Sequence, residues 1–221
     1  MSLFAVGSVS AAGFGVGAAG HWMNVDASGN EKTNTAVGSE TTTASVSETN
    51  TIPSYYIEFT MGDDNNMAIG YEAIPGSADV SDKTHTRTDT ETSVTGTAAA
   101  VSNSRKFTAD AEVEDFKVIY AELPLGSFYV RAGISEITVN TLETKSGNGG
   151  NYGNATLDGI QYGLGMKGVA KERIRWKAGW ELNDFENLKL TSTGNSVTAE
   201  TNSLTADLDT SAFKVGIGLQ F

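Results

Sequence analysis

The sequence predicts an all-β chain in which eight antiparallel strands, connected up-and-down, close into a barrel that crosses a membrane. Three observations carry this prediction. Eight segments alternate large apolar residues with small or polar ones, short and long connections follow one another in turn, and the chain ends on an aromatic residue, Phe221. Side chains alternate between the two faces of a strand, so each segment has one apolar face. An even strand number with short turns at one end and long loops at the other is typical of a transmembrane barrel.

The eight predicted strands share this period of two. They cover residues 12–23, 54–61, 67–74, 113–123, 128–138, 157–167, 174–183 and 213–221. A tilted strand needs roughly 9–11 residues to cross a bilayer, and most of these segments approach that length. No run of about 18 apolar residues is present, so a transmembrane helix is not predicted.

The connections set the orientation of the chain. Those after the second, fourth and sixth strands are short, and we assign them to the periplasmic side together with both termini. The long connections are predicted to be extracellular loops at about 25–53, 75–112, 140–155 and 185–209. They are rich in Ser, Thr, Asn, Asp and Glu, so we expect them to be solvated and mobile. Residues 189–208 are β-rich enough to extend the last two strands beyond the bilayer.

A single barrel domain, residues 12–221, accounts for the chain after its first residues. Residues 1–11 have an apolar stretch followed by small residues, and Val9-Ser10-Ala11 resembles a cleavage site at the end of a secretory signal peptide. The basic segment that begins such signals is missing. An apolar extension of the first strand is therefore the alternative.

Composition excludes several function classes. The net charge of −12 argues against nucleic acid, because phosphate binding requires clusters of Lys and Arg. The absence of Cys excludes disulfide scaffolds, thiol catalysis and Cys-ligated zinc. The 25 glycines against 3 prolines fit closely packed strands better than a disordered chain.

Alternation alone does not say whether the apolar faces point inward, as in a soluble barrel, or toward lipid. The polar faces combine glycines with long charged groups, which suit a narrow interior better than a solvated surface. Aromatic residues gather near the strand ends in two belts, as expected at the two membrane interfaces. The predicted interface aromatics are Phe14, Trp22, Tyr55, Phe116, Tyr120, Phe128, Trp176, Phe213 and Phe221.

The opposite faces predict a set of charges in the lumen. Its members are Glu58, Glu72, Lys117, Arg131, Lys167, Arg175, Lys177, Glu181 and Lys214. The interior of an eight-stranded barrel is just wide enough for side chains, and an isolated buried charge costs several kcal/mol, so opposite charges must pair there. Two hypotheses follow: a salt-bridge network that holds the barrel closed, or a gated narrow pore that opens when one pair breaks.

Catalysis and metal binding have little support in the residues. The two histidines are His21 and His85, and a Ser/His/acid site would require His21 to meet Ser135 or Asp184, which no spacing indicates. The acidic turn at residues 63–64 could attract Ca²⁺, but it lacks EF-hand spacing. We therefore expect no catalytic residue, no metal site and no cofactor.

The loop layout and the closing strand, Phe213 to Phe221, resemble the OmpA/OmpX/OmpW-type eight-stranded outer-membrane barrels of Gram-negative bacteria. The resemblance implies location in the bacterial outer membrane, contact with its lipid and lipopolysaccharide, and recognition of the last strand by the barrel assembly machinery. This family includes adhesins, invasins, small pores and a few lipid enzymes, so the fold does not select one activity. We expect a non-enzymatic structural or surface-interaction protein whose acidic loops contact a surface ligand or phage. The alternative is a small porin-like channel for small solutes or hydrophobic molecules.

Overall fold

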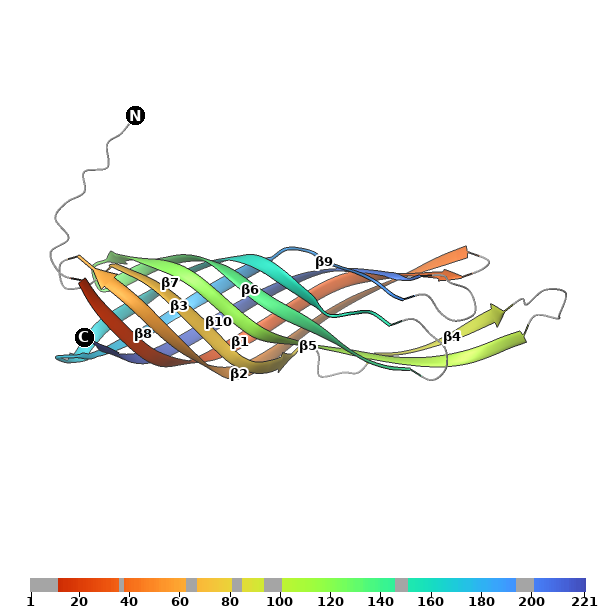
Figure 1. Ribbon diagram of the computed structural model, residues 1–221, viewed down its shortest axis with the longest axis horizontal. Helices are drawn as coiled ribbons and strands as arrows, with labels where there is room; N and C mark the ends of the chain where they lie inside the picture. Colours follow the sequence, from red (N-terminus) through yellow and green to blue (C-terminus); the bar gives the residue numbers. More distant parts are fainter. Residues whose placement is uncertain are drawn as a thin grey trace, which may run out of the picture.

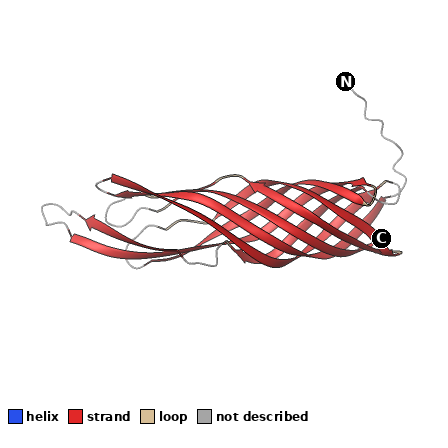
Figure 2. Ribbon diagram, turned by 180° about the vertical axis from the view of Figure 1, so that it is seen from behind, coloured by secondary structure: helices blue, strands red, loops and turns tan. Residues whose placement is uncertain are grey.

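The computed structural model describes residues 12–35, 38–62, 67–80, 85–93, 101–145, 151–193 and 201–221. All the regular elements in these ranges are β-strands, and they form one long cylinder (Figures 1 and 2). Within the described ranges no helix has the length and hydropathy that a membrane span requires. The segment 1–11, interpreted as a signal-peptide remnant, and the acidic turn at residues 63–64 lie outside the described residues.

Eight strands make the barrel, as predicted. They are β1 (Ala12–Thr35), β2 (Gly38–Met61), β3 (Met67–Asp79), β5 (Val101–Leu125), β6 (Phe128–Lys145), β7 (Ala155–Lys171), β8 (Ile174–Phe185) and β10 (Ser203–Gln220). Each pairs antiparallel with the next one in this series, and β10 pairs with β1 to close the ring. Two further strands lie beyond the barrel: β4 (His85–Ser93) pairs with β5, and β9 (Leu188–Thr191) pairs with β10.

The strands are strongly inclined to the barrel axis. The register, followed once round the ring from Gly15 on β1, returns to β1 at Val25, which is ten residues further along the strand. With the usual spacings along and between strands, this stagger corresponds to a tilt of about 40°. Such a tilt is ordinary for a membrane barrel.

Much of what was expected to be mobile loop is paired strand. The β1–β2 ladder runs without interruption from Ala12↔Met61 to Thr35↔Gly38, so most of residues 25–53 is a hairpin. In the same way β5 begins at Val101, inside the predicted loop 75–112, and β6 continues to Lys145. The backbone N–H and C=O groups of a strand pair are satisfied by the ladder itself, without large apolar side chains. Thr and Val also favour strands. The loop prediction gave too little weight to both effects. Of the two predicted extensions within 189–208, that of the last strand is present, because β10 begins at Ser203, whereas β8 ends at Phe185 and the separate short strand β9 pairs with β10.

The strands separate into two arms at the end opposite the short turns (Figure 1). The last pair between β2 and β3 is Tyr55↔Ala73. Beyond it β2 stays with β1, β10 and β9, which we call the β1–β2 arm. On the other side of the gap β4, β5 and β6 form the β4–β5 arm.

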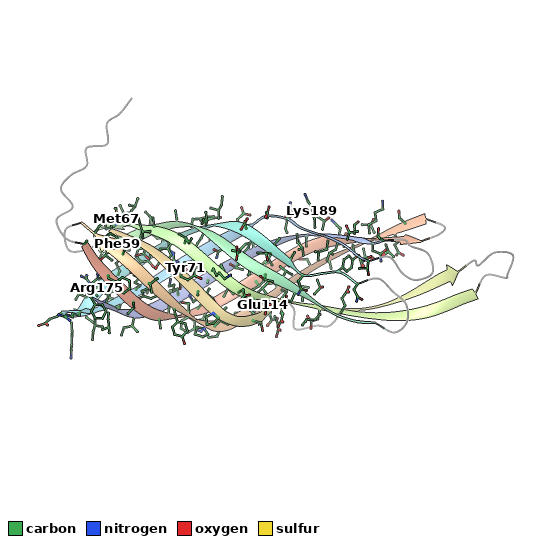
Figure 3. The ribbon with its side chains drawn as sticks, viewed as in Figure 1. Phe59, Met67, Tyr71, Glu114, Arg175 and Lys189 are labelled. Atoms are coloured by element: carbon green, nitrogen blue, oxygen red, sulfur yellow. The ribbon has the colours of Figure 1, made fainter. Side chains whose placement is uncertain are left out.

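Large apolar side chains cover the outside of the barrel (Figure 3). Phe59 and Met67 lie at the end with the short turns, and Lys189 lies toward the arms. Ile57, Ile134, Ile160, Leu164 and Ile217 are each about half exposed or more. Apolar groups are stable in these positions against lipid, so this band is the membrane-facing surface.

One strand was assigned to the wrong face. On β5 the side chains of Phe116, Val118 and Tyr120 are buried inside the barrel, while Ile119 points outward and is 54% exposed. Both faces of this strand carry apolar residues, so alternation does not tell which one meets lipid. The interior position suits Tyr120 because its hydroxyl donates to Glu58 at 2.7 Å.

Inward-facing glycines make room for three tyrosine rings. Tyr56 lies against Gly17 and Gly218, Tyr120 against Gly70, and Tyr129 against Gly165 and Gly179. A Cβ atom on Gly17 would stand 2.3 Å from the Tyr56 ring and 2.6 Å from the Ile217 carbonyl oxygen. The alternating glycines of the sequence are therefore a packing requirement of the lumen.

We predict that Gly17→Ala destabilises the barrel by about 1–3 kcal/mol, because the methyl group overpacks against Tyr56 and a backbone carbonyl. Gly20→Ala on the same strand is the matched control, since a Cβ there meets no atom within 4 Å. The measurement is the urea unfolding midpoint of each variant folded in detergent or lipid. Equal midpoints for the two variants would contradict the packing argument.

Candidate functional site

The candidate site is a buried group of charges inside the barrel, which we call the lumen cluster. Its carboxylates are Glu58, Glu72, Glu122 and Glu181, and its cations are Arg131, Lys167, Lys177 and Lys214. They come from β2, β3, β5, β6, β7, β8 and β10. Each stands on the inward face because it alternates with a lipid-facing apolar residue. All of them are buried except Lys167, whose side chain is 14% exposed.

Glu72 is the most heavily contacted carboxylate of the lumen cluster. Its Oε2 accepts from Lys214 Nζ at 2.5 Å and from Arg131 Nη2 at 2.6 Å. Its Oε1 accepts from Ser54 Oγ at 2.5 Å and lies 3.1 Å from His21 Nε2. One side chain on β3 thus ties together residues of β1, β2, β6 and β10.

Arg131 makes contacts on every side of its guanidinium group. Nε donates to Gln161 at 2.7 Å, and Nη1 forms an ion pair with Glu181 at 2.8 Å. The guanidinium carbon lies 3.4 Å from the centre of the Tyr120 ring. A planar, permanently charged fork suits this combination of paired carboxylates and an aromatic face.

Lys177 organises the part of the lumen cluster nearest the short turns. Its ammonium group donates to Glu58 and, at 2.8 and 2.9 Å, to both oxygens of Glu122. Glu122 also pairs with Lys167 at 3.4 Å. Since each carboxylate of the lumen cluster has at least one cation, the arrangement neutralises itself.

An apolar layer lies in the barrel toward the arms. It includes Met23, Val25, Ile74, Val113, Phe116, Ile137, Leu157, Phe185 and Leu208. Each of these side chains is at most 5% exposed. Along the barrel axis the described side chains therefore form a charged layer followed by an apolar layer.

The structure places most of the predicted lumen charges inside. Glu58, Glu72, Arg131, Lys177, Glu181 and Lys214 are buried together, Lys167 joins them, and Arg175 is half-buried near the short turns. Lys117 was wrongly placed in the lumen. It points outward and pairs with Glu136 at 3.2 Å, both side chains being nearly half exposed.

Sequence reasoning missed several members of the site. Glu122 follows Tyr120 on the inward face of β5, and it was lost when that face was taken as lipid-facing. His21 and Ser54 also contact Glu72, and neither was among the predicted lumen residues. Gln161 was not predicted to belong to the site, because it is uncharged and the prediction considered charged residues.

Seven of the nine predicted interface aromatics are on the outside of the barrel. Phe14, Trp22, Tyr55, Phe128, Trp176, Phe213 and Phe221 are 39–62% exposed. Phe116 and Tyr120 are corrections, because both are buried in the lumen for the reason given for β5. Trp22 and Trp180 flank Phe213, with ring centres 6.0 and 6.4 Å from it, and form part of the extracellular belt.

A row of aspartates lies just beyond this belt on the outer face. Asp26, Asp209 and Asp184 are direct register partners on β1, β10 and β8. Partial burial and the charges of Asp184, Asp207 and Asp26 raise the pKa of Asp209 above its usual range. Within the described ranges no three acidic or histidine side chains are arranged to hold a metal ion.

We predict that Glu72→Gln lowers the free energy of unfolding by about 3–5 kcal/mol, because it leaves Arg131 and Lys214 with less compensation in a buried site. Glu136→Gln is the control, since its ion pair with Lys117 is exposed and screened by solvent. Urea unfolding of both variants in lipid checks this. A midpoint for Glu72→Gln equal to that of Glu136→Gln would show that the lumen cluster does not stabilise the barrel.

We also predict that Asp184→Asn lowers the pKa of Asp209 toward its ordinary value, because it removes a neighbouring negative charge. The raised pKa means that the folded state favours protonated Asp209. Its contribution to stability is therefore present at low pH and is lost as the pH rises through the folded pKa. Carboxyl-carbon NMR titration of Asp209 measures the shift, and Asp79→Asn on β3 is the control. An unchanged titration in Asp184→Asn would exclude the proposed coupling.

Comparison with known proteins reveals the fold. No protein-family model and no curated protein sequence matches the chain. Among solved structures, the outer membrane protein OprG from Pseudomonas aeruginosa is similar with a TM-score of 0.53 and 13% identity, covering 96% of each chain. The outer membrane protease OmpT from Escherichia coli has a TM-score of 0.54 and 7% identity, covering 98% of this chain and 99% of its own. With its apolar outer band, the chain therefore has the fold of a β-barrel protein of the bacterial outer membrane.

Proposed function

We propose that the protein is a non-enzymatic surface-interaction protein, in which a closed barrel anchors two β-arms outside the cell. The observation that carries this proposal is the length of the β1–β2 ladder. It continues from the belt residue Trp22 to Thr35, a distance of roughly 40 Å along a strand. A strand that only had to cross the membrane and turn would end much sooner.

The chemistry of the β1–β2 arm suits contact with a polar partner. The outward face of β2 carries a row of exposed hydroxyl groups from Ser39, Thr41, Thr43, Ser45, Ser47, Thr49 and Thr51. Some of them are held by β1: Thr43 donates to Asn30 at 2.7 Å, and Ser47 and Thr49 donate to Asn24 at 3.2 Å. Such ordered hydroxyls lose little entropy on binding, so they support a recognition surface.

The barrel interior also favours an anchor over a pore for ions. Glu72, Arg131 and Lys177 close the lumen with paired charges, and the apolar layer follows. Opening a polar path through them would leave buried charges without partners. A role for the arms is therefore better supported than conduction of small solutes.

Removal of the β1–β2 arm tests the proposal. Joining Ala27 to Val46 through Asn-Gly gives a two-residue hairpin between two register partners, so the barrel should still fold. We predict unchanged heat-modifiable gel mobility but loss of most attachment of expressing bacteria to epithelial monolayers, or of phage adsorption. Gly20→Ala, which leaves the arm intact, is the control. If the variant without the arm attaches and adsorbs phage as well as the wild type, the proposal is wrong.

Transport of hydrophobic molecules is the second candidate. It is favoured by the apolar layer and by the separation of β2 from β3 beyond Tyr55↔Ala73. The test pairs planar-bilayer conductance with uptake of an apolar dye into liposomes. Dye uptake without channel events would favour this candidate, whereas channel events that Arg131→Ala increases would favour a porin-like pore.

A further inference from the structure

One edge of the β1–β2 arm has no partner strand among the described residues. From Gly38 to Ser54, β1 is the only strand of the described ranges that pairs with β2, and the pairing of β2 with β3 begins at Tyr55. The register of this stretch shows no bulge. It contains no Lys or Arg, and its only proline, Pro53, lies at the base. Bulges, lysines and prolines are the usual means by which proteins block an exposed edge, so this edge is open to pairing.

The opposite side of the gap is different. On β3 the register shifts between Ile74 and Ser77, where Pro75 precedes Gly76 with φ of 95°. A bulge and a proline make that side a poor template. At the base of the gap Asn50 Nδ2 donates to the Asp79 carbonyl at 3.0 Å, so a side chain takes the place of a strand-to-strand pair. The regular edge is therefore the part of β2 beyond Asn50, residues 38–49.

We propose that this β2 edge, residues 38–49, binds an extended segment of a partner polypeptide by strand addition, with basic residues of that segment opposite Glu40 and Glu48. The backbone N–H and C=O groups of an unpaired edge supply affinity for any extended chain, and side chains supply selectivity. The inference rests on the proposed surface-interaction function and names the class of its partner.

The charges of the edge select a basic segment. Glu40 and Glu48 point to the same face of β2, and the residues opposite them on β1 are the uncharged Thr33 and Val25. The two carboxylates therefore have no cation at the facing position of the ladder. An added strand with Lys or Arg at those two positions forms cross-strand charge pairs, and the net charge of −12 attracts such a segment from a distance.

The same charges disfavour a second copy of this chain. An antiparallel pairing of two copies that uses residues 38–50 in full is centred on Ala44. It brings Glu40 of one copy opposite Glu48 of the other, twice. Like charges directly opposite one another destabilise a strand pair.

The test uses two synthetic 13-residue peptides of alternating Thr and Val. One carries Lys at the positions opposite Glu40 and Glu48, and the other carries Glu there. We expect the Lys peptide to slow amide hydrogen exchange within residues 39–49 of the full protein in lipid, and the Glu peptide to bind about tenfold more weakly. The double variant Glu40→Lys/Glu48→Lys should reverse this preference. A Lys peptide with N-methylated backbone cannot pair and is the control.

Three results would overturn the inference. The first is that the Lys peptide does not slow amide hydrogen exchange in residues 39–49, and the second is that it slows exchange on β4 instead. The third is that the charge-reversed variant still prefers the Lys peptide to the Glu peptide. If the Ala44→Cys variant forms disulfide-linked dimers in the absence of peptide, the partner of this edge is a second copy of the chain. If the peptides fail but removal of the arm abolishes attachment, the arm binds by its face and the proposed function stands. If the peptides bind but attachment survives removal of the arm, the proposed function falls instead.

Discussion

The interaction on which the barrel depends is the contact of Glu72 with Arg131 and Lys214 in the lumen. These residues stand on β3, β6 and β10, which are not neighbours in the ring. The closed ring of backbone ladders sets the diameter of the barrel, and the side chains that cross the lumen add direct contacts between its opposite walls. The three side chains are buried, so leaving one of these charges unpaired would be costly. The tyrosines stacked on glycines fill the remaining space.

This constraint also supports the proposed location of function in the arms. Lumen side chains whose charges neutralise one another are poor ligands for anything else, and the apolar layer separates them from the extracellular mouth. The proposed recognition role therefore falls to the arms, which extend the same ladders beyond the barrel. Because β2 beyond Tyr55 is paired on one side only within the described part of the chain, the arm presents both a polar face and an open edge there. The acidic residues of that edge are the basis of its proposed preference for a basic segment.

The eight strands and their order could be predicted from the period of two, because each needed one apolar face for lipid. The face of β5 could not, since Phe116 and Ile119 are equally apolar, and the contacts that distinguish inside from outside, Tyr120 with Glu58 and Glu122 with Lys177, are made with other strands. Glu122 was missed and Lys117 was misplaced for that one reason. The arms were missed because Ser and Thr lower the hydropathy of a strand without weakening its ladder. The charges of the lumen were found because several lay opposite unmistakable lipid-facing residues, as Glu58 does beside Ile57 and Phe59.

The alternation of apolar and polar residues along the strands also indicates where the membrane surface lies. Along β2 the outward residues change from Phe59 and Ile57 to Thr51 and Thr49, while the inward residues change from Glu58 to Ile52 and Val46. The alternation continues without a break, but its polarity inverts near Tyr55 because the outer solvent changes from lipid to water. The same inversion occurs on β10, where outward Phe213 gives way to Asp209 and inward Lys214 gives way to Leu208. Inside the water-exposed arms an apolar interior is favoured by the ordinary hydrophobic effect, whereas within the bilayer the apolar groups gain by facing out. The same strand therefore places its apolar residues outward in the barrel and inward in the arm. The position at which this orientation inverts is the boundary between barrel and arm.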